Sequence, residues 1–277
     1  MPDTSTHGPP GTLVMVGGNE DKVGSRLILT ELARLTGNGR LEVATLASEE
    51  PDVQWQTYSR LFREFGVRDV VHLRAETRDE LIEPAPIALF EGVTGVFFTG
   101  GDQLKITTKL GGTPIYDRVR ALYKQEGGLI AGTSAGAAAM GQMMLMSPDA
   151  EGTEKHKLGR AFIMARGLGF TRDMVIDQHF AQRARIERLL GAMAENPGVL
   201  GVGIDEDTAI VVNGPMFRVI GSGAVYVADG SHISYTNATQ GRPDKTLCLF
   251  DVRLHVLSHG SCFHMAQRKP SLETFKD

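Results

Sequence analysis

The sequence predicts a three-layer α/β/α protein, in which a largely parallel central sheet carries helices on both faces and antiparallel strands extend it near the C-terminus. Two observations support this fold class. Short apolar runs alternate with segments of helical spacing up to Gly198, and beyond this residue only short strands between tight turns remain. We expect a flexible start over residues 1–11 and a single domain over residues 12–277.

Strands and helices alternate in the first half of the chain. Each expected strand is an apolar run that ends at glycine or polar residues, and each expected helix repeats apolar side chains every three or four residues. The expected strands cover residues 12–16, 41–46, 67–73, 95–99 and 129–131. The expected helices cover residues 27–35, 53–65 and 119–123. Pro84 and Pro86 interrupt the segment 77–90.

The second half begins with a polar segment, residues 147–160, which is typical of a long surface loop. An apolar strand follows over residues 174–176, and a helix that carries Arg183, Arg185 and Arg188 is expected after His179. Turn signals such as Asn213-Gly214 and Asp229-Gly230 then separate a series of short strands. These strands are expected over residues 201–204, 209–212, 218–220, 224–227, 247–252 and 255–257.

Composition narrows the class of protein. The net charge of −4 gives no basic field for nucleic acid or for an anionic membrane, so we expect neither partner. Cys248 and Cys262 lack metal-binding spacing and suit a reducing compartment, a single late disulfide being the alternative. No apolar run approaches a membrane span, and no secretory signal begins the chain. We therefore expect a cytoplasmic protein.

A nucleophile elbow is predicted at Gly132-Thr133-Ser134-Ala135-Gly136, a G-x-S-x-G match between a strand and small helix-forming residues. Glycines allow the sharp turn because a Cβ atom would clash there. Ser134 would then stand at a helix N-terminus, whose N–H groups favour a developing anion. The alternative is a helix start rich in glycine and alanine, with Ser134 as its N-cap.

A serine nucleophile needs a base and an acid that orients the base. His179 is the candidate base because it follows the strand 174–176 and so faces the crevice at the carboxyl ends of the strands. Glu206 is the candidate acid, within the run Asp205-Glu206-Asp207 between apolar strands. The alternatives are a polar loop residue for His179 and a solvated turn for the acids. The order serine, histidine, acid differs from that of the α/β-hydrolases.

No metal or cofactor is expected. His255, His259 and His264 lie near Cys262, but no H-E-x-x-H motif or cysteine pair accompanies them. Strand alternation would also place their side chains on opposite faces.

Four segments carry a resemblance to a known family: Gly100-Gly101-Asp102-Gln103, Gly132-Thr133-Ser134-Ala135-Gly136, Asp177-Gln178-His179-Phe180 with the arginines after it, and Gly203-Ile204-Asp205-Glu206. The chain resembles the cyanophycinases, which belong to a serine peptidase family that also contains the α-aspartyl dipeptidases (peptidase E). The resemblance extends from Thr12 to about His264. It implies a flavodoxin-like fold similar to the class I glutamine amidotransferase domain, and a homodimer.

Carried over position by position, the resemblance makes Ser134 the nucleophile, His179 the base and Glu206 the orienting acid. Gly101 and Ala135 match the positions whose backbone N–H groups would form the oxyanion hole. The positions that line the substrate pocket of the family are matched by Gln103, Asp177, Gln178, Arg183, Arg185 and Arg188.

The implied activity is exopeptidase hydrolysis of cyanophycin, a polyaspartate with an arginine joined to each side-chain carboxyl, to β-aspartyl-arginine dipeptides. Arginine forks bind carboxylates and an aspartate binds a guanidinium, which suits this substrate. The alternatives are a solvated helix face for the arginines, an α-aspartyl dipeptidase acting on small peptides, and a non-catalytic binding protein. The length of 277 residues and the arginine-rich segment favour the polymer enzyme, because peptidase E chains are shorter. Serine as the nucleophile argues against an amidotransferase, because those enzymes use cysteine.

Overall fold

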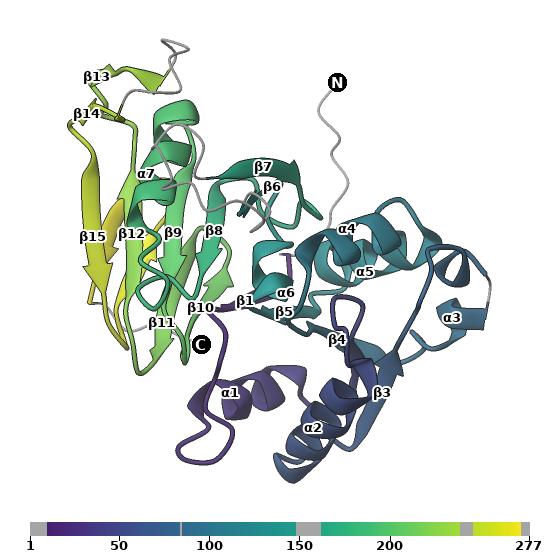
Figure 1. Ribbon diagram of the computed structural model, residues 1–277. Coiled ribbons are helices and arrows are strands. Elements are labelled where there is room, and N and C mark those ends of the chain that lie inside the picture. Colours follow the sequence, from purple (N-terminus) through teal and green to yellow (C-terminus); the bar gives the residue numbers. More distant parts are fainter. Residues whose placement is uncertain (1–9, 84, 148–161, 239–245, 273–277) are drawn as a thin grey trace.

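The computed structural model describes residues 10–83, 85–147, 162–238 and 246–272 (Figure 1). Its main sheet has nine strands, of which five are parallel and occupy one half. In spatial order these are β1 (Thr12–Val16), β5 (Leu129–Thr133), β4 (Val93–Phe98), β2 (Arg40–Ala44) and β3 (Asp69–Leu73). The other half continues from β1 with antiparallel strands: β10 (Thr208–Asn213), β11 (Met216–Gly221), β16 (Cys262–His264) and β17 (Lys269–Ser271).

Helices cover both faces of the parallel half, as Figure 1 shows. One face carries α1 (Leu27–Thr36) and α2 (Pro51–Glu64), whose apolar sides pack with alternate strand residues. The other face carries α4 (Gln103–Leu110), α5 (Pro114–Gln125) and α6 (Ala135–Ala138). A 3₁₀ turn (Asp79–Leu81) and α3 (Ala85–Ala88) form the interrupted segment before β4. The predicted α/β class with helices on both faces is therefore confirmed.

A second sheet of four strands stands beside the first (Figure 1). Its order is β15 (Arg253–Leu257), β12 (Val225–Asp229), β9 (Leu200–Ile204) and β8 (Met174–Gln178), with β8 and β9 parallel. Helix α7 (Ile186–Glu195) packs against β9 and β12. Two small ribbons complete the described strands: β6 (Met143–Met146) with β7 (Ile163–Arg166), and β13 (Tyr235–Thr236) with β14 (Leu249–Phe250).

Three differences from the sequence-based expectation follow. The late strands do not form one extension, because β10 and β11 join the main sheet while β9, β12 and β15 join the second. Helix α4 was not predicted, although Asp102 caps it by accepting a hydrogen bond from the N–H of Leu104 at 2.8 Å. Helix α7 begins at Ile186, so the arginines just before it lie in a loop.

Some expectations fall where the structure gives no description. Residues 1–9 of the expected flexible start and residues 148–161 of the expected surface loop lie outside the described residues. Within the described part of the chain, none of the helices is both long enough and apolar enough to cross a membrane.

Candidate active site

The G-x-S-x-G segment forms a sharp turn between β5 and α6. Ser134 has φ 53° and ψ −114°, a backbone conformation that side chains larger than glycine rarely adopt. The flanking glycines permit it, because a Cβ on Gly132 would lie 2.5 Å from the backbone of Gly136 and one on Gly136 would lie 2.3 Å from the carbonyl oxygen of Phe98. The Ser134 N–H donates to the carbonyl of Val16 at 3.0 Å, which ties the turn to the end of β1. The predicted elbow is thus present.

Three side chains from separate elements form a hydrogen-bonded relay. Ser134 Oγ lies 2.9 Å from His179 Nε2, and His179 Nδ1 lies 2.6 Å from Glu206 Oε1. His179 follows the carboxyl end of β8, and Glu206 lies in the turn between β9 and β10. The ring of His179 is nearly buried, whereas Ser134 and Glu206 are half-buried. The structure therefore brings together the three residues that the sequence nominated as nucleophile, base and acid.

The loop after β1 holds this relay in place, a role that the sequence analysis did not assign. Asn19 donates from its side-chain amide to Glu206 Oε2 at 2.9 Å, so both carboxylate oxygens of Glu206 are engaged. Gly18 has φ +101°, and a Cβ on it would lie 2.4 Å from the ring of His179. The N–H of His179 donates to the carbonyl of Gly17 at 2.8 Å. From the sequence, this loop at a strand end is one of three expected to form the active-site crevice, with Gly100-Gly101-Asp102-Gln103 and the Ser134 elbow, but no single residue of it is assigned a role.

Beneath the elbow lies a buried carboxylate, Glu20, which the sequence analysis also left without a role. It accepts hydrogen bonds from Thr133 Oγ1 at 2.6 Å and from the hydroxyl of Tyr58, and it pairs with Lys22 at 3.0 Å. Burial alone would raise the pKa of Glu20, but Lys22 and the two hydroxyl donors outweigh burial and hold the pKa below its usual value. Glu20 thus fixes the residue that precedes Ser134.

The two acids beside Glu206 serve the backbone. Asp205 accepts from the N–H of Ala181 at 2.9 Å and of Ala224 at 3.1 Å, which joins the β8–α7 loop to the start of β12. Asp207 accepts from the N–H of Asp21 at 2.8 Å. Of the three carboxylates in this run, Glu206 therefore belongs to the relay, and Asp205 and Asp207 hold loops together.

The electrostatic surroundings keep the base neutral and the acid ionised. Burial lowers the pKa of His179, and Arg183 and Arg185 lower it further against the opposing effect of Glu206. Hydrogen bonds from Asn19 and His179 lower the pKa of Glu206. At neutral pH the imidazole can therefore accept a proton from Ser134, while the carboxylate stabilises the imidazolium that results.

An open hollow adjoins Ser134 on the side of the predicted oxyanion hole. It measures about 810 Å³, and its lining includes Gly100, Gly101 and Ser134. Ala135 is the first residue of α6, so its N–H has no acceptor within the helix. The backbone of Gly101 has φ +136°, and a Cβ on it would lie 2.2 Å from the carbonyl oxygen of Ala47. These features suit the two positions predicted to stabilise an oxyanion.

The residues predicted to line the substrate pocket differ in what they contact. Asp177 has no exposed surface, and two arginines enclose it: Arg188 through a bidentate pair that includes Nε at 2.6 Å, and Arg185 through Nη1 at 3.2 Å. Gln178 is nearly buried, with Oε1 3.5 Å from Ser134 Oγ. Gln103 donates to the carbonyl of Leu145 at 2.9 Å.

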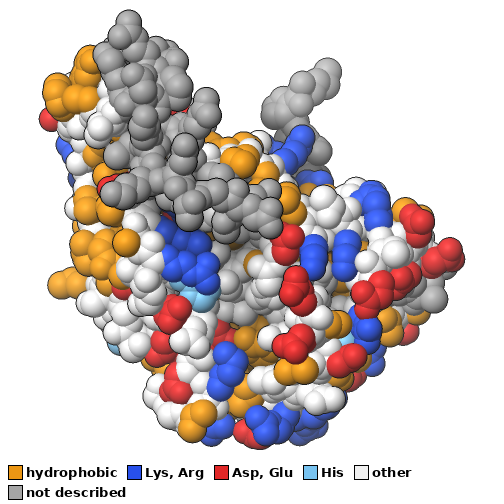
Figure 2. All heavy atoms as spheres, viewed as in Figure 1, with side chains coloured by type: hydrophobic (Ala, Val, Ile, Leu, Met, Phe, Trp, Pro, Cys, Tyr) orange, Lys and Arg blue, Asp and Glu red, His pale blue; other side chains and the backbone are white. Residues whose placement is uncertain are grey.

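Arg183 is the exposed member of the predicted set. Figure 2 shows a group of basic side chains beside a histidine on this face of the molecule. The alternative for the three arginines was a solvated helix face. Arg183 and Arg185 precede α7 and Arg188 is buried, so none of the three lies on such a face. In the described ranges, no group of three or more His, Cys, Asp or Glu side chains could hold a metal ion.

A serine on a strained turn at a helix N-terminus, hydrogen-bonded to a histidine that a glutamate orients, defines the class of serine peptidases and related serine hydrolases. Comparison with known proteins specifies the family. The sequence pattern of Peptidase family S51 matches residues 13–220, and the chain belongs to this family.

Relatives in sequence agree with this assignment, and the fold is also seen in a solved structure. The chain is 36% identical over 262 residues to the cyanophycinase of Synechococcus elongatus, an alignment that covers 93% of this chain and 80% of the relative. It is 36% identical over 263 residues to the cyanophycinase of Geminocystis herdmanii, with coverage of 94% and 95%. A peptidase from an acI-B1 Actinobacterium has a similar fold, with a TM-score of 0.69, 19% identity, and coverage of 92% and 97% of the two chains.

Proposed function

We propose that this chain is a serine exopeptidase that hydrolyses cyanophycin to β-aspartyl-arginine dipeptides. The relatives at 36% identity over nearly the whole chain are cyanophycinases, which supports this substrate. The observation that carries the catalytic part is the relay from Ser134 through His179 to Glu206, with distances of 2.9 Å and 2.6 Å.

The proposed reaction begins when His179 Nε2 takes the proton of Ser134 and the alkoxide attacks the backbone carbonyl of a substrate aspartate. The N–H groups of Gly101 and Ala135 hold the oxyanion that forms. His179 returns the proton to the leaving amine, and an acyl-enzyme remains. The same histidine then activates water to hydrolyse this ester, while Glu206 holds the imidazole in the required tautomer.

We divide the predicted pocket residues between binding and positioning. Arg183 is exposed beside the relay and is proposed to bind a substrate carboxylate. Gln178 is proposed to contact substrate at the nucleophile. Asp177 is buried under Arg185 and Arg188, and it is proposed to fix these arginines rather than to bind a guanidinium.

The decisive experiment is incubation of the purified chain with cyanophycin, followed by detection of β-aspartyl-arginine, with Ser134→Ala as control. Release by the native chain and loss of about 10⁴-fold or more in the variant is the expected result. Hydrolysis of Asp-X dipeptides without action on the polymer would select the α-aspartyl dipeptidase alternative. A chain inert on both substrates would select the binding-protein alternative.

A homodimer in the cytoplasm completes the proposal. The exposed edge strand β15 supports the dimer, because Leu254 and Val256 point to the same side and are 48% and 61% exposed. Sedimentation of the native chain at twice the monomer mass, and of Val256→Glu at the monomer mass, would support this surface as the interface. A native monomer would refute the dimer.

A further inference from the structure

A second charged hollow adjoins the one at Ser134. The two share the loop between β2 and α2, because Ser48, Glu49 and Glu50 line both. The second hollow measures about 640 Å³, and its remaining charged residues are Asp52, Arg74, Glu76, Lys105 and Lys109. Both hollows open along the carboxyl ends of neighbouring parallel strands, where ligands bind in folds of this type. Their volumes are those of ligand sites.

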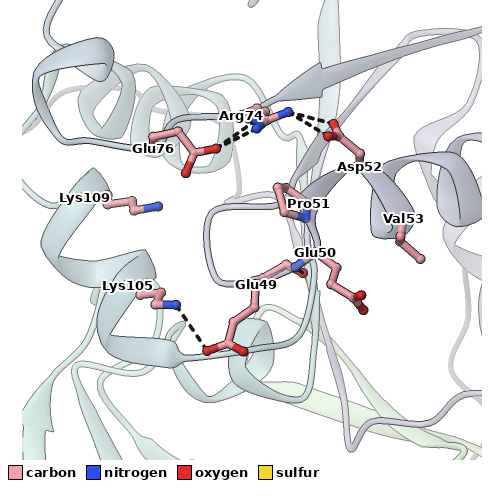
Figure 3. A pocket seen from close by; sticks show the side chains of 10 residues that line it. Glu49, Glu50, Pro51, Asp52, Val53, Arg74, Glu76, Lys105 and Lys109 are labelled. Carbon is pink, nitrogen blue, oxygen red and sulfur yellow. Dashed lines mark hydrogen bonds and ion pairs between the residues drawn. The ribbon is translucent and has the colours of Figure 1, made fainter.

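The charged side chains of the second hollow form two groups. In Figure 3, Arg74 is joined to Asp52 and Glu76, and Lys105 is joined to Glu49. Arg74 is held from both sides, by Asp52 at 2.8 Å and by Glu76 at 2.7 Å. Lys109 donates to the carbonyl of Ala75 at 2.8 Å. These contacts satisfy the residues that form the wall.

The residues at the shared loop are engaged far less. The side chain of Glu49 is 88% exposed, and its ion pair with Lys105 spans 3.7 Å, near the limit for such a contact. Figure 3 shows the carboxylate of Glu50 without a partner among the residues drawn. An exposed pair at this distance is weak, so a ligand can replace it at little cost. Two carboxylates and one ammonium are therefore open to a ligand next to the path to Ser134.

This pattern of charges matches the repeat unit of the proposed substrate. Each side chain of cyanophycin ends in a guanidinium and in the α-carboxylate of the same arginine, whereas its backbone is neutral. A site for several such units needs carboxylates and ammonium groups side by side. In Figure 2 acidic and basic side chains are interspersed over the face between α4 and α2. Weak contacts of this kind add up along a polymer, because each bound unit raises the effective concentration of the next.

We propose that the second hollow binds repeat units of the polymer beyond those at the scissile bond, with Glu49 and Glu50 binding guanidinium groups and Lys105 binding α-carboxylates. This inference rests on the proposed function. It makes the affinity of the enzyme depend on substrate length, while the reaction at Ser134 is unchanged.

The test compares two substrates with the double variant Glu49→Gln/Glu50→Gln. For long soluble cyanophycin, KM is expected to rise about tenfold with kcat unchanged, whereas a synthetic substrate of two β-aspartyl-arginine units is expected to change less than twofold. Lys105→Gln is expected to give a smaller effect of the same kind. The matched control is Glu91→Gln/Glu195→Gln, which removes two exposed acids that line neither hollow and should change neither substrate.

Equal effects on both substrates, or no effect on either, would overturn the inference while the proposed function stands. A native chain that cleaves neither substrate would refute the proposed function, and the inference with it. Added salt sharpens the result, because it should raise the KM of the native chain for the polymer more steeply than that of the double variant.

Discussion

Two charged regions flank the nucleophile, and they use their charges in opposite ways. At the carboxyl end of β8, Asp177 is fully buried, and its oxygens accept hydrogen bonds from Arg185 in the loop that follows and from Arg188 in α7. In the loop from β2 to α2, Glu49 and Glu50 are exposed toward a hollow. The residue types are alike in the two regions, so they do not show which one binds a ligand. What distinguishes the regions is whether the protein itself supplies the partners.

We call the region around Asp177 the closed region and the loop with Glu49 and Glu50 the open region. The largest change in stability is expected when the buried acid of the closed region is removed. Asp177→Ala removes the counter-charge of two nearly buried arginines and should lower the free energy of unfolding by about 3–5 kcal/mol. Urea denaturation of the native chain and the variant measures this change. Unchanged stability with a raised KM would instead make Asp177 a direct ligand of the substrate, and the contrast between the two regions would fail.

Glu42 offers a third arrangement, a buried acid without a partner. It has no exposed surface, neither carboxylate oxygen has a hydrogen-bond partner among the described residues, and burial raises its pKa from 4.5 to about 8. The unfolded chain therefore loses this proton at lower pH than the folded chain, so stability falls as pH rises from 4.5 to about 8. Glu42→Gln cannot ionise, so its stability relative to the native chain should rise by about 2–3 kcal/mol between pH 5 and pH 7.

Urea denaturation at several pH values checks this expectation. A stability difference between Glu42→Gln and the native chain that does not grow with pH would show that the carboxyl is ionised in the fold. The lack of partners around Glu42, in contrast to the two arginines around Asp177, would then not keep its carboxyl protonated.

Arg183 lies at the exposed end of the closed region, and its substitution tests whether its charge acts on His179. Its charge contributes to the lowered pKa of His179, so Arg183→Gln should raise that pKa. The base must be neutral, and activity falls as pH falls through its pKa, so the acidic limb of kcat/KM should move to higher pH. Arg60→Gln, an exposed arginine on α2, is the control. An unmoved limb with a raised KM would leave Arg183 only its binding role.

The smallest effect is expected in the open region. Glu50→Gln alone should change the free energy of unfolding by less than about 0.5 kcal/mol, because its carboxylate forms no ion pair with the residues that the structure describes. A clear loss of stability would show that Glu50 supports the fold, and the distinction between open and closed charges would need revision.

Much of the fold and the catalytic centre could be predicted from the sequence. Alternating apolar runs and helical periodicity gave the layers, and Gly132 and Gly136 marked the turn at Ser134 because only glycine fits there. The strand end before His179 and the acidic run around Glu206 nominated these two residues, and the resemblance assigned them the same roles. These signals are local, since each depends on a short stretch of chain and its own backbone geometry.

The rest was decided only by the tertiary structure. Asn19 contacts Glu206 across 187 positions of the chain and Glu20 contacts Thr133 across 113, so no local pattern announces either role. The burial of Asp177 and the exposure of Glu49 likewise depend on which elements pack beside them. The sequence by itself determined the layers, the turn and the nucleophile, because backbone propensity and apolar spacing act at short range. The partners of each charge arise only when distant strands and loops meet, because hydrogen bonds and desolvation depend on surroundings that the chain acquires on folding.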